Sequence, residues 1–171
     1  MSGSGEDSGV HEGDDLRTPE RLRTLSSRLL SLLSAQAERL VGEGLAEVGA
    51  RKWHYAVLAS LQEYGPGSQA ALSRKTGIYR SDMVGVLNEL EGDGLVERAP
   101  DPGDRRRNVI TITGSGRERL HRLDAILDGL HEELLAPLDQ AERDRFVGTL
   151  TLLLDHHTRA RRAVSPPART P

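Results

Sequence analysis

Residues 68–113, SQAALSRKTGIYRSDMVGVLNELEGDGLVERAPDPGDRRRNVITIT, contain two short helical patterns followed by two strand patterns. Ser68 suits the N-cap of a first helix, and Gly77 suits its end, because a glycine readily takes the left-handed conformation that terminates helices. A second helix starts from about Tyr79. Its inward face carries apolar residues at helical spacing, Met83, Leu87 and Leu90. This spacing of two short helices predicts a helix-turn-helix.

The segments 95–99 (LVERA) and 108–113 (NVITIT) have the β-branched, alternating composition of short strands. The Pro-Gly turn in residues 99–108, APDPGDRRRN, joins them, so they predict a β-hairpin. A hairpin directly after a helix-turn-helix is the wing of a winged helix-turn-helix. The sequence therefore predicts a mainly α fold with this unit in its middle.

The chain on the N-terminal side reads as one long, leucine-rich helix from residue 18. Thr18 suits its N-cap and Pro19 its first position, where the missing N–H has no cost. Gly42 and Gly44 interrupt the pattern, and residues 51–65 form a further helix. On the C-terminal side, Thr113 caps a helix that ends near Pro137. Asp139 and Glu142 then form the capping box of the last helix.

These end helices carry more apolar surface than the small winged unit can cover, so we expect them to form a dimerisation domain of a homodimer. The predicted division of the chain is as follows: a disordered acidic tail (1–17), a dimerisation helix (18–50), a winged helix-turn-helix DNA-binding domain (51–112), dimerisation helices (113–160) and a disordered tail (161–171).

The 171 residues carry a net charge of −3, but residues 1–17 alone contribute −4. The remaining chain is therefore close to neutral, and a local basic site is compatible with this charge. The absence of cysteine excludes disulfides and thiolate metal sites. The polar N-terminus lacks the apolar segment of a secretory signal. We expect a cytoplasmic, nucleoid-associated protein with no metal and no cofactor.

Candidate DNA-contacting residues follow from this arrangement. The predicted recognition helix offers polar or small residues to the major groove, namely Tyr79, Arg80, Ser81, Gly85 and Asn88. Residues expected at the DNA backbone are Ser68, Gln69, Arg74 and Lys75. At the tip of the wing, Arg105, Arg106 and Arg107 can enter a minor groove, and Asp101 and Asp104 can orient them. The alternative is a solubilising turn with weak surface salt bridges.

The segment 94–120, GLVERAPDPGDRRRNVITITGSGRERL, together with the preceding helix-turn-helix, resembles the MarR family of winged helix-turn-helix transcription regulators. The resemblance spans roughly residues 20–158. The family's wing motif, Asp-x-Arg-Asp-x-Arg, falls on Asp101, Gly103, Asp104 and Arg106. Gly103 replaces the first arginine, so Arg105 or Arg107 can substitute for it. Gly85 stands where many members carry a base-reading arginine.

The resemblance implies a homodimer that binds a pseudo-palindromic operator in double-stranded DNA, usually as a repressor released by a small aromatic or phenolic effector. Trp53, His54 and Tyr55 are the candidate effector-pocket or dimer-contact residues. The first alternative is that they pack in the core. The second is that Trp53 forms a pocket wall, while His54 pairs with a ligand anion or makes a pH-sensitive dimer contact.

The sequence contains no arrangement typical of a nucleophilic, phosphate-binding or metal-dependent enzyme, so we expect a protein that is not an enzyme. The competing functional class is a winged-helix protein–protein interaction module whose basic wing contacts an acidic partner. A DNA-binding protein and such a module differ in how their affinity depends on salt and on DNA sequence.

Overall fold

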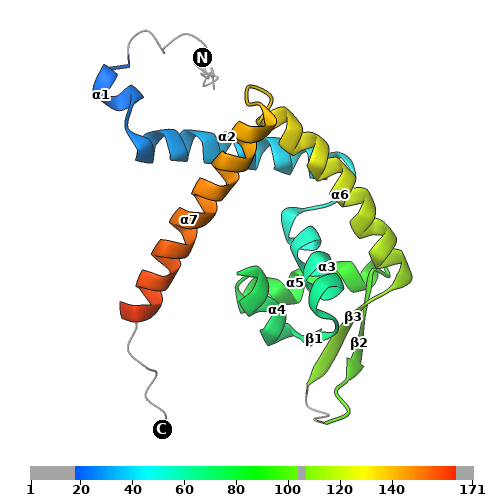
Figure 1. The fold of residues 1–171 in the computed structure, drawn as a ribbon. Helices are drawn as coiled ribbons and strands as arrows, with labels where there is room; N and C mark the ends of the chain where they lie inside the picture. The colour runs from blue at the N-terminus through cyan, green and yellow to red at the C-terminus, as the bar shows by residue number, and fades with distance from the viewer. Residues whose placement is uncertain (1–17, 104–106, 165–171) are drawn as a thin grey trace, which may run out of the picture.

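A computed structural model describes residues 18–103 and 107–164 (Figure 1). The helices are α1 (Glu20–Arg23), α2 (Ser26–Glu47), α3 (Lys52–Tyr64), α4 (Gln69–Thr76), α5 (Arg80–Gly92), α6 (Gly114–Leu134) and α7 (Gln140–Val164). The strands are β1 (Gly67–Ser68), β2 (Val96–Pro100) and β3 (Asn108–Ile112). None of these described helices is long and apolar enough to cross a lipid bilayer.

The helix-turn-helix predicted from the sequence is confirmed by α4 and α5. The Ser68 hydroxyl accepts a hydrogen bond from the N–H of Ala71, which caps α4. Gly77 ends this helix in the left-handed conformation, with a φ of 74°. Tyr79 is the N-cap of α5. The sequence signals at Ser68, Gly77 and Tyr79 therefore mark the start and end of α4 and the start of α5.

The wing is the predicted hairpin of β2 and β3, which pair antiparallel from Val96 opposite Ile112 to Pro100 opposite Asn108. The sequence reading missed β1, whose two residues pair with the other edge of β3, so the sheet order is β1-β3-β2. This third strand ties the N-terminus of α4 to the base of the wing. The helix-turn-helix and the wing thereby form one packed unit.

The winged unit, α3 to β3, has a dense apolar core. Fully buried side chains include Val57, Leu58, Leu61, Leu72, Met83, Leu87, Leu90 and Ile110. Leu45 at the end of α2 and Leu123 on α6 also belong to this core. Burial of such side chains contributes about 1.5–3 kcal/mol each. The core thus fixes α5 relative to the wing.

The expectation that Gly42 and Gly44 interrupt the first long helix is wrong, because α2 continues through both residues to Glu47. A Cβ atom on Gly44 would lie 2.7 Å from the Cδ1 atom of Leu130 on α6. Gly44 therefore permits α6 to pack closely on α2, as Figure 1 shows. Helix packing, rather than helix termination, explains this glycine.

The N-terminal helix also differs from the prediction, because it is divided into α1 and α2. Thr24 ends α1, and its hydroxyl donates a hydrogen bond to the carbonyl of Glu20. Leu25 is extended and precedes α2. Pro19, rather than Thr18, is the N-cap of α1. A single residue in an extended conformation was enough to separate two segments that share one leucine pattern.

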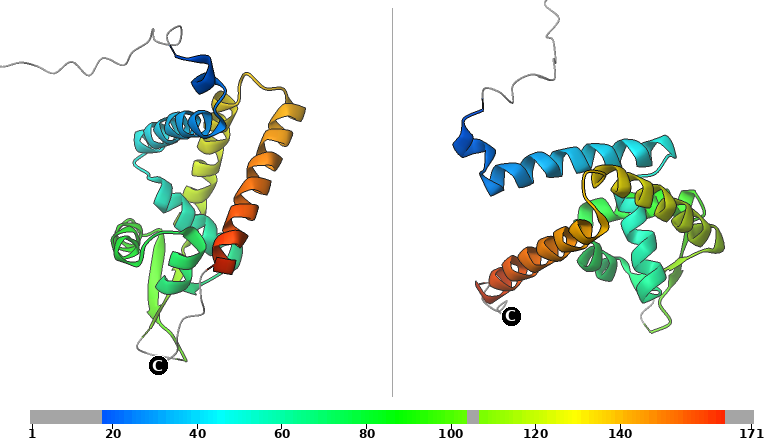
Figure 2. Two further views of the ribbon diagram at one scale, coloured as in Figure 1. Left: turned by 90° about the vertical axis from the view of Figure 1, so that its left-hand side faces the viewer. Right: turned by 45° about the horizontal axis from the view of Figure 1, so that its top comes forward.

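The last helix, α7, begins with the predicted capping box: the Asp139 N–H donates to the Glu142 carboxylate, and the Glu142 N–H donates to the Asp139 carboxylate. The helix extends from the end of α6 as a separate arm (Figures 1 and 2). It continues to Val164, so residues 161–164 are helical rather than part of a disordered tail. The predicted tails at 1–17 and 165–171 lie outside the described residues.

Candidate nucleic-acid interface

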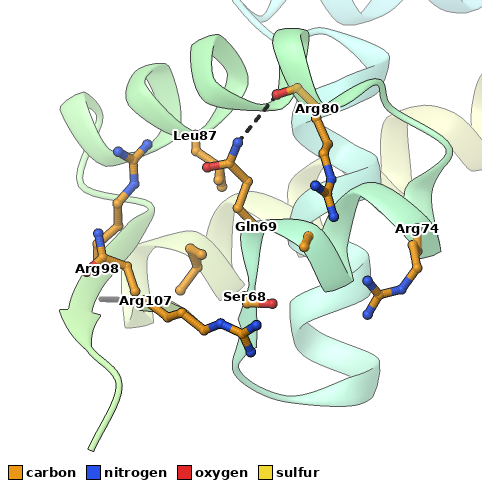
Figure 3. Close-up of a pocket in the computed structure, with 10 residues that line it drawn as sticks. Ser68, Gln69, Arg74, Arg80, Leu87, Arg98 and Arg107 are labelled. Carbon is orange, nitrogen blue, oxygen red and sulfur yellow. Dashed lines mark hydrogen bonds between the residues drawn. The ribbon is translucent and has the colours of Figure 1, made fainter. Parts of the chain in front are cut away.

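A hollow of about 500 Å³ lies between the helix-turn-helix and the wing (Figure 3). Its lining residues are Ser68, Gln69, Ala70, Arg74, Arg80, Leu87, Arg98, Arg107, Asn108 and Ile110. Four of these ten described residues are arginines and none is acidic. Guanidinium groups are suited to anionic oxygens, since each offers several N–H donors in a planar fork.

Three of the arginines turn toward the same space. In Figure 3, Arg80 projects from α5 beside Gln69, Arg107 reaches toward Ser68 from the wing, and Arg74 lies further along α4 at the edge of the hollow. Gln69 is itself held in place, because its Nε2 donates a hydrogen bond of 3.4 Å to the carbonyl of Arg80. The structure thus brings predicted residues from α4, α5 and the wing together around one hollow.

Lys75, which the sequence placed beside Arg74 as a backbone contact, has a different neighbour. Its ammonium lies 3.8 Å from the centre of the Tyr64 ring, at the end of α3. Such a cation–π contact holds the lysine against the protein surface. Lys75 is not among the residues that line the arginine-rich hollow.

The exposed face of α5 is formed by residues at helical spacing. It contains Ser81, Val84, Gly85 and Asn88. Nothing lies within 4 Å of the position that a Cβ atom would take on Gly85. The glycine therefore has no packing role in the described chain, and it leaves this part of the face flat. The Ser81 hydroxyl donates a hydrogen bond of 3.0 Å to the neighbouring Asp82.

Two acidic residues of α5 are paired with arginines from neighbouring elements. Glu89 forms an ion pair with Arg51, which precedes α3. Glu91 lies 3.5 Å from the Nε atom of Arg98 on β2. Arg98 also donates a hydrogen bond of 2.7 Å to the side-chain oxygen of Asn88. These pairs offset negative charge on the helix that carries the predicted base contacts.

At the wing, Asp101 and Arg107 are the only residues of the predicted arginine cluster and its orienting aspartates that are described. The Asp101 carboxylate accepts a hydrogen bond of 2.8 Å from the N–H of Gly103, and its own N–H donates to the carbonyl of Arg107. Asp101 thus shapes the turn. The predictions for Asp104, Arg105 and Arg106 lie outside the described residues.

The three candidate pocket residues, Trp53, His54 and Tyr55, have different environments in the structure. Trp53 is 37% exposed, so the interpretation of it as a core residue is wrong. His54 is buried within its own chain, with Nε2 2.8 Å from the Glu89 carboxylate, and its role as a ligand partner or dimer contact stays a prediction. Tyr55 is half-buried on the side of Asp124; burial and then a hydrogen bond with this residue raise the pKa of the phenol.

The pKa of His54 is lowered from its ordinary value of 6.5, mainly because burial disfavours the charged imidazolium. The Arg51 guanidinium acts in the same direction, followed by that of Arg119, while Asp93 opposes them. The neutral imidazole can still donate its Nε2–H to Glu89. His54 therefore serves as a neutral hydrogen-bonding link between α3 and α5.

A second hollow, of about 580 Å³, lies between α2 and the start of α3. Its lining residues are Ser34, Ala37, Glu38, Val41, Gly42, Ala46, Ala50, Arg51, Lys52 and Trp53. The Lys52 ammonium lies 4.8 Å from the centre of the Trp53 ring. This groove combines apolar walls with two cationic side chains, Arg51 and Lys52, and one carboxylate, Glu38. Arg51 is also the residue that pairs with Glu89.

Sequence reasoning missed Arg98, Arg51 and Glu89. The strand pattern identified Arg98 only as a residue of the hairpin, and the helical pattern identified Glu89 only as a polar position. The alternation along β2 does place Arg98 on the same face as Val96, toward α5. This alternation is the signal that could have identified Arg98.

Residues 53–107 match the model of the MarR family. The chain is 30% identical over 101 residues to the HTH-type transcriptional repressor NicR of Pseudomonas putida, covering 59% of this chain and 64% of NicR. It is also 30% identical over 96 residues to the transcriptional regulator HosA of Escherichia coli, covering 56% of this chain and 71% of HosA. The alignment thus spans less than two thirds of NicR.

Among solved structures, the transcriptional repressor CouR bound to a 23-mer DNA duplex is similar, with a TM-score of 0.72 and 26% identity. The comparison covers 79% of this chain and 96% of CouR. A probable transcriptional regulator from Pseudomonas aeruginosa gives a TM-score of 0.69 with 29% identity, over 78% of this chain and 99% of that one. The sequence match, the helix-turn-helix and the wing agree, and the chain belongs to the MarR family.

Proposed function

We propose that this protein is a transcriptional repressor that binds a pseudo-palindromic operator in double-stranded DNA as a homodimer. The observation that carries this proposal is the arginine-lined hollow between α4, α5 and the wing. NicR is a transcriptional repressor, and CouR is a repressor with a structure bound to duplex DNA. Both support the same function for this chain.

In the proposed complex, α5 lies in a major groove and the wing follows the adjoining backbone toward a minor groove. Arg80 at the start of α5 is placed to contact a base edge, as arginine does with guanine. Arg74 and Arg107 approach from the two sides of the hollow, so they are suited to backbone phosphates. Arg105, Arg106 and Arg107 remain the residues expected to enter that minor groove.

The homodimer is supported by the apolar side chains that the end helices leave exposed. These are Leu22, Leu25, Leu29, Leu30, Leu32 and Leu33 on the N-terminal side, and Val147, Leu152, Leu153 and Leu154 on α7. Monomeric proteins rarely expose so many neighbouring apolar residues. A two-fold axis through these helices can place two copies of α5 about 34 Å apart, which is one turn of DNA.

The groove between α2 and α3 is the proposed effector site. Its apolar wall and the Trp53 ring suit a small aromatic molecule, and Arg51 and Lys52 suit an acidic group on it. Arg51 connects this groove to α5 through Glu89. An acidic ligand that competes with Glu89 for Arg51 would therefore break the ion pair that holds α5, the proposed DNA-contacting helix, against the start of α3.

The test starts with selection of bound sequences from random duplex DNA by the full-length protein. Affinity for the selected duplex is then measured by fluorescence anisotropy over a range of salt concentrations. We expect log affinity to fall linearly with log salt. Arg74→Ala should weaken binding to all duplexes and reduce the salt slope by about 1, while Arg80→Ala should also relax the sequence preference.

Arg39→Ala is the matched control, because Arg39 is an exposed arginine of α2 that pairs with Glu43 on the same helix. It should leave DNA affinity unchanged. If the parent protein selects no sequence and Arg74→Ala binds duplex DNA as well as the parent does, the proposal is wrong. Binding to acidic proteins, but not to DNA, would then favour the alternative of a protein–protein interaction module.

A further inference from the structure

Arg98 of β2 differs from the other arginines of the hollow in the direction of its side chain. The Arg98 side chain points from β2 toward α5 (Figure 3). One N–H of its guanidinium donates a 2.7 Å hydrogen bond to the side-chain oxygen of Asn88. Its Nε atom is buried and lies 3.5 Å from the Glu91 carboxylate. The Arg98 side chain is 23% exposed. Arg98 therefore contacts two positions of α5 that are one turn apart.

This contact fixes the orientation of the Asn88 amide. An arginine carries only donors, so the oxygen of the amide, and not its NH₂ group, must face Arg98. The NH₂ group then points to the other side of the side chain. Asn88 ends the exposed face formed with Ser81 and Gly85, so the fixed amide lies on the surface that α5 presents.

We propose that Arg98 is a positioning residue that sets the base preference of Asn88 without itself contacting the DNA. This inference rests on the proposed function, since it concerns one base pair of each operator half-site. An asparagine free to rotate presents either its oxygen or its NH₂ group, and so discriminates poorly between a donor and an acceptor on a base edge. With its oxygen held by Arg98, Asn88 presents one arrangement of donors and acceptors.

The second contact of Arg98 has a separate role. Because Glu91 would otherwise add an unpaired negative charge to α5, its pairing with Arg98 reduces repulsion between this helix and DNA. This effect does not depend on the base sequence. Loss of Arg98 should therefore have two separable consequences, a uniform loss of affinity through Glu91 and a loss of discrimination at one base pair through Asn88.

The experiment compares the sequences selected from random duplex DNA by the parent, Asn88→Ala, Arg98→Ala and the double variant, together with their affinities for the parent's preferred duplex. We expect Asn88→Ala and Arg98→Ala to lose preference at the same base pair of each half-site, by about tenfold. The double variant should lose no further preference there. Glu91→Gln in the Arg98→Ala background should restore part of the uniform affinity, but not this preference.

Arg98→Met covers the case in which Arg98→Ala fails to fold, since methionine keeps an aliphatic stem but has no N–H donor for Asn88 and no charge for Glu91. Like Arg98→Ala, it should lose preference at the Asn88 position and part of the general affinity. The inference is overturned if loss of Arg98 weakens all duplexes equally, or changes a different base pair from loss of Asn88. A parent protein that selects no sequence would overturn the proposed function as well, so the two failures are distinguishable.

Discussion

The winged unit and the end helices of this chain differ in how far their apolar side chains are buried within a single chain. In the winged unit, Leu58, Met83 and Leu90 are completely inaccessible to solvent within a single chain. On the end helices, Leu29 is 48% exposed and Leu153 is 44% exposed. The core of the winged unit is therefore closed within one chain, with Leu45 of α2 and Leu123 of α6 as part of it. In contrast, α1, α2 and α7 leave apolar side chains exposed among the described residues.

This difference separates two kinds of stability. The core of the winged unit should contribute the same free energy at any protein concentration. The end helices should contribute stability that depends on concentration, because it arises only on association. The separation also suits the proposed function, since the distance between two winged units can change without disturbance of either core.

The largest effect is expected from charges placed on the exposed apolar faces. Leu29→Glu combined with Leu153→Glu should weaken dimerisation at least about a thousandfold, or about 4 kcal/mol, because each leucine is lost twice in a two-fold dimer. Sedimentation velocity over a concentration series measures this change. The matched control is Ser31→Glu with Thr151→Glu, which adds the same charge on other faces of α2 and α7. Equal weakening by both variants would contradict the assigned interface.

A smaller loss is expected in the core of the winged unit. Leu58→Ala should lower the free energy of unfolding by about 3 kcal/mol, the sum of lost burial and the cavity left behind. Urea denaturation should give the same loss in the parent and in the Leu29→Glu/Leu153→Glu background, because distant sites act additively. If the two losses differed by more than about 1 kcal/mol, the winged unit would not be independent of the end helices.

The part of the fold that the sequence predicted correctly depends on short-range signals. Ser68 and Gly77 bound α4, and Asp139 with Glu142 begins α7, because each signal acts within one helical turn. Gly44 was misread because its role depends on Leu130, which is distant in the sequence. The division at Leu25 was missed because the leucine pattern continues across it.

In the candidate site, as in the fold, the sequence predicted the residues that short-range patterns identify but not the contacts that depend on packing between elements. The helix-turn-helix spacing led to Arg80, and the cap pattern led to Ser68, both of which line the hollow. The pairing of Arg98 with Asn88 could not be predicted in the same way, because it requires the packing of β2 against α5. His54 and Glu89 likewise come together only through the packing of α3 on α5.

Two glycines give the next comparison, one at the base of the wing and one on α2. A Cβ on Gly116 would lie 2.1 Å from the backbone oxygen of Leu95, whereas the atoms nearest to a Cβ on Gly44 belong to the branched end of the Leu130 side chain. Gly116→Ala should therefore cost about 2–3 kcal/mol of unfolding free energy, since the backbone must move. Gly44→Ala should change it by less than about 1 kcal/mol, as the gain in helix propensity offsets a rotamer change. Equal losses in urea denaturation would contradict this difference between a rigid and an adaptable contact.

The smallest effect is expected at His54, where the end of α2, the start of α3 and α5 meet. Because its pKa is lowered in the folded state, the unfolded chain takes up the proton first as the pH falls below 6.5. Stability should therefore be fully present above this pH and decline below it until the lower folded pKa is reached, by at most about 1.4 kcal/mol for each pH unit.

His54→Gln tests this assignment, since glutamine can still donate a hydrogen bond to Glu89 but does not titrate. Urea denaturation between pH 7.5 and 5.5 should show a decline in the parent that is absent from the variant. An identical decline in both would assign the titration to other groups. A parent that became more stable as the pH fell would mean that the Glu89 carboxylate outweighs burial, and that the link between α3 and α5 is an ion pair rather than a neutral hydrogen bond.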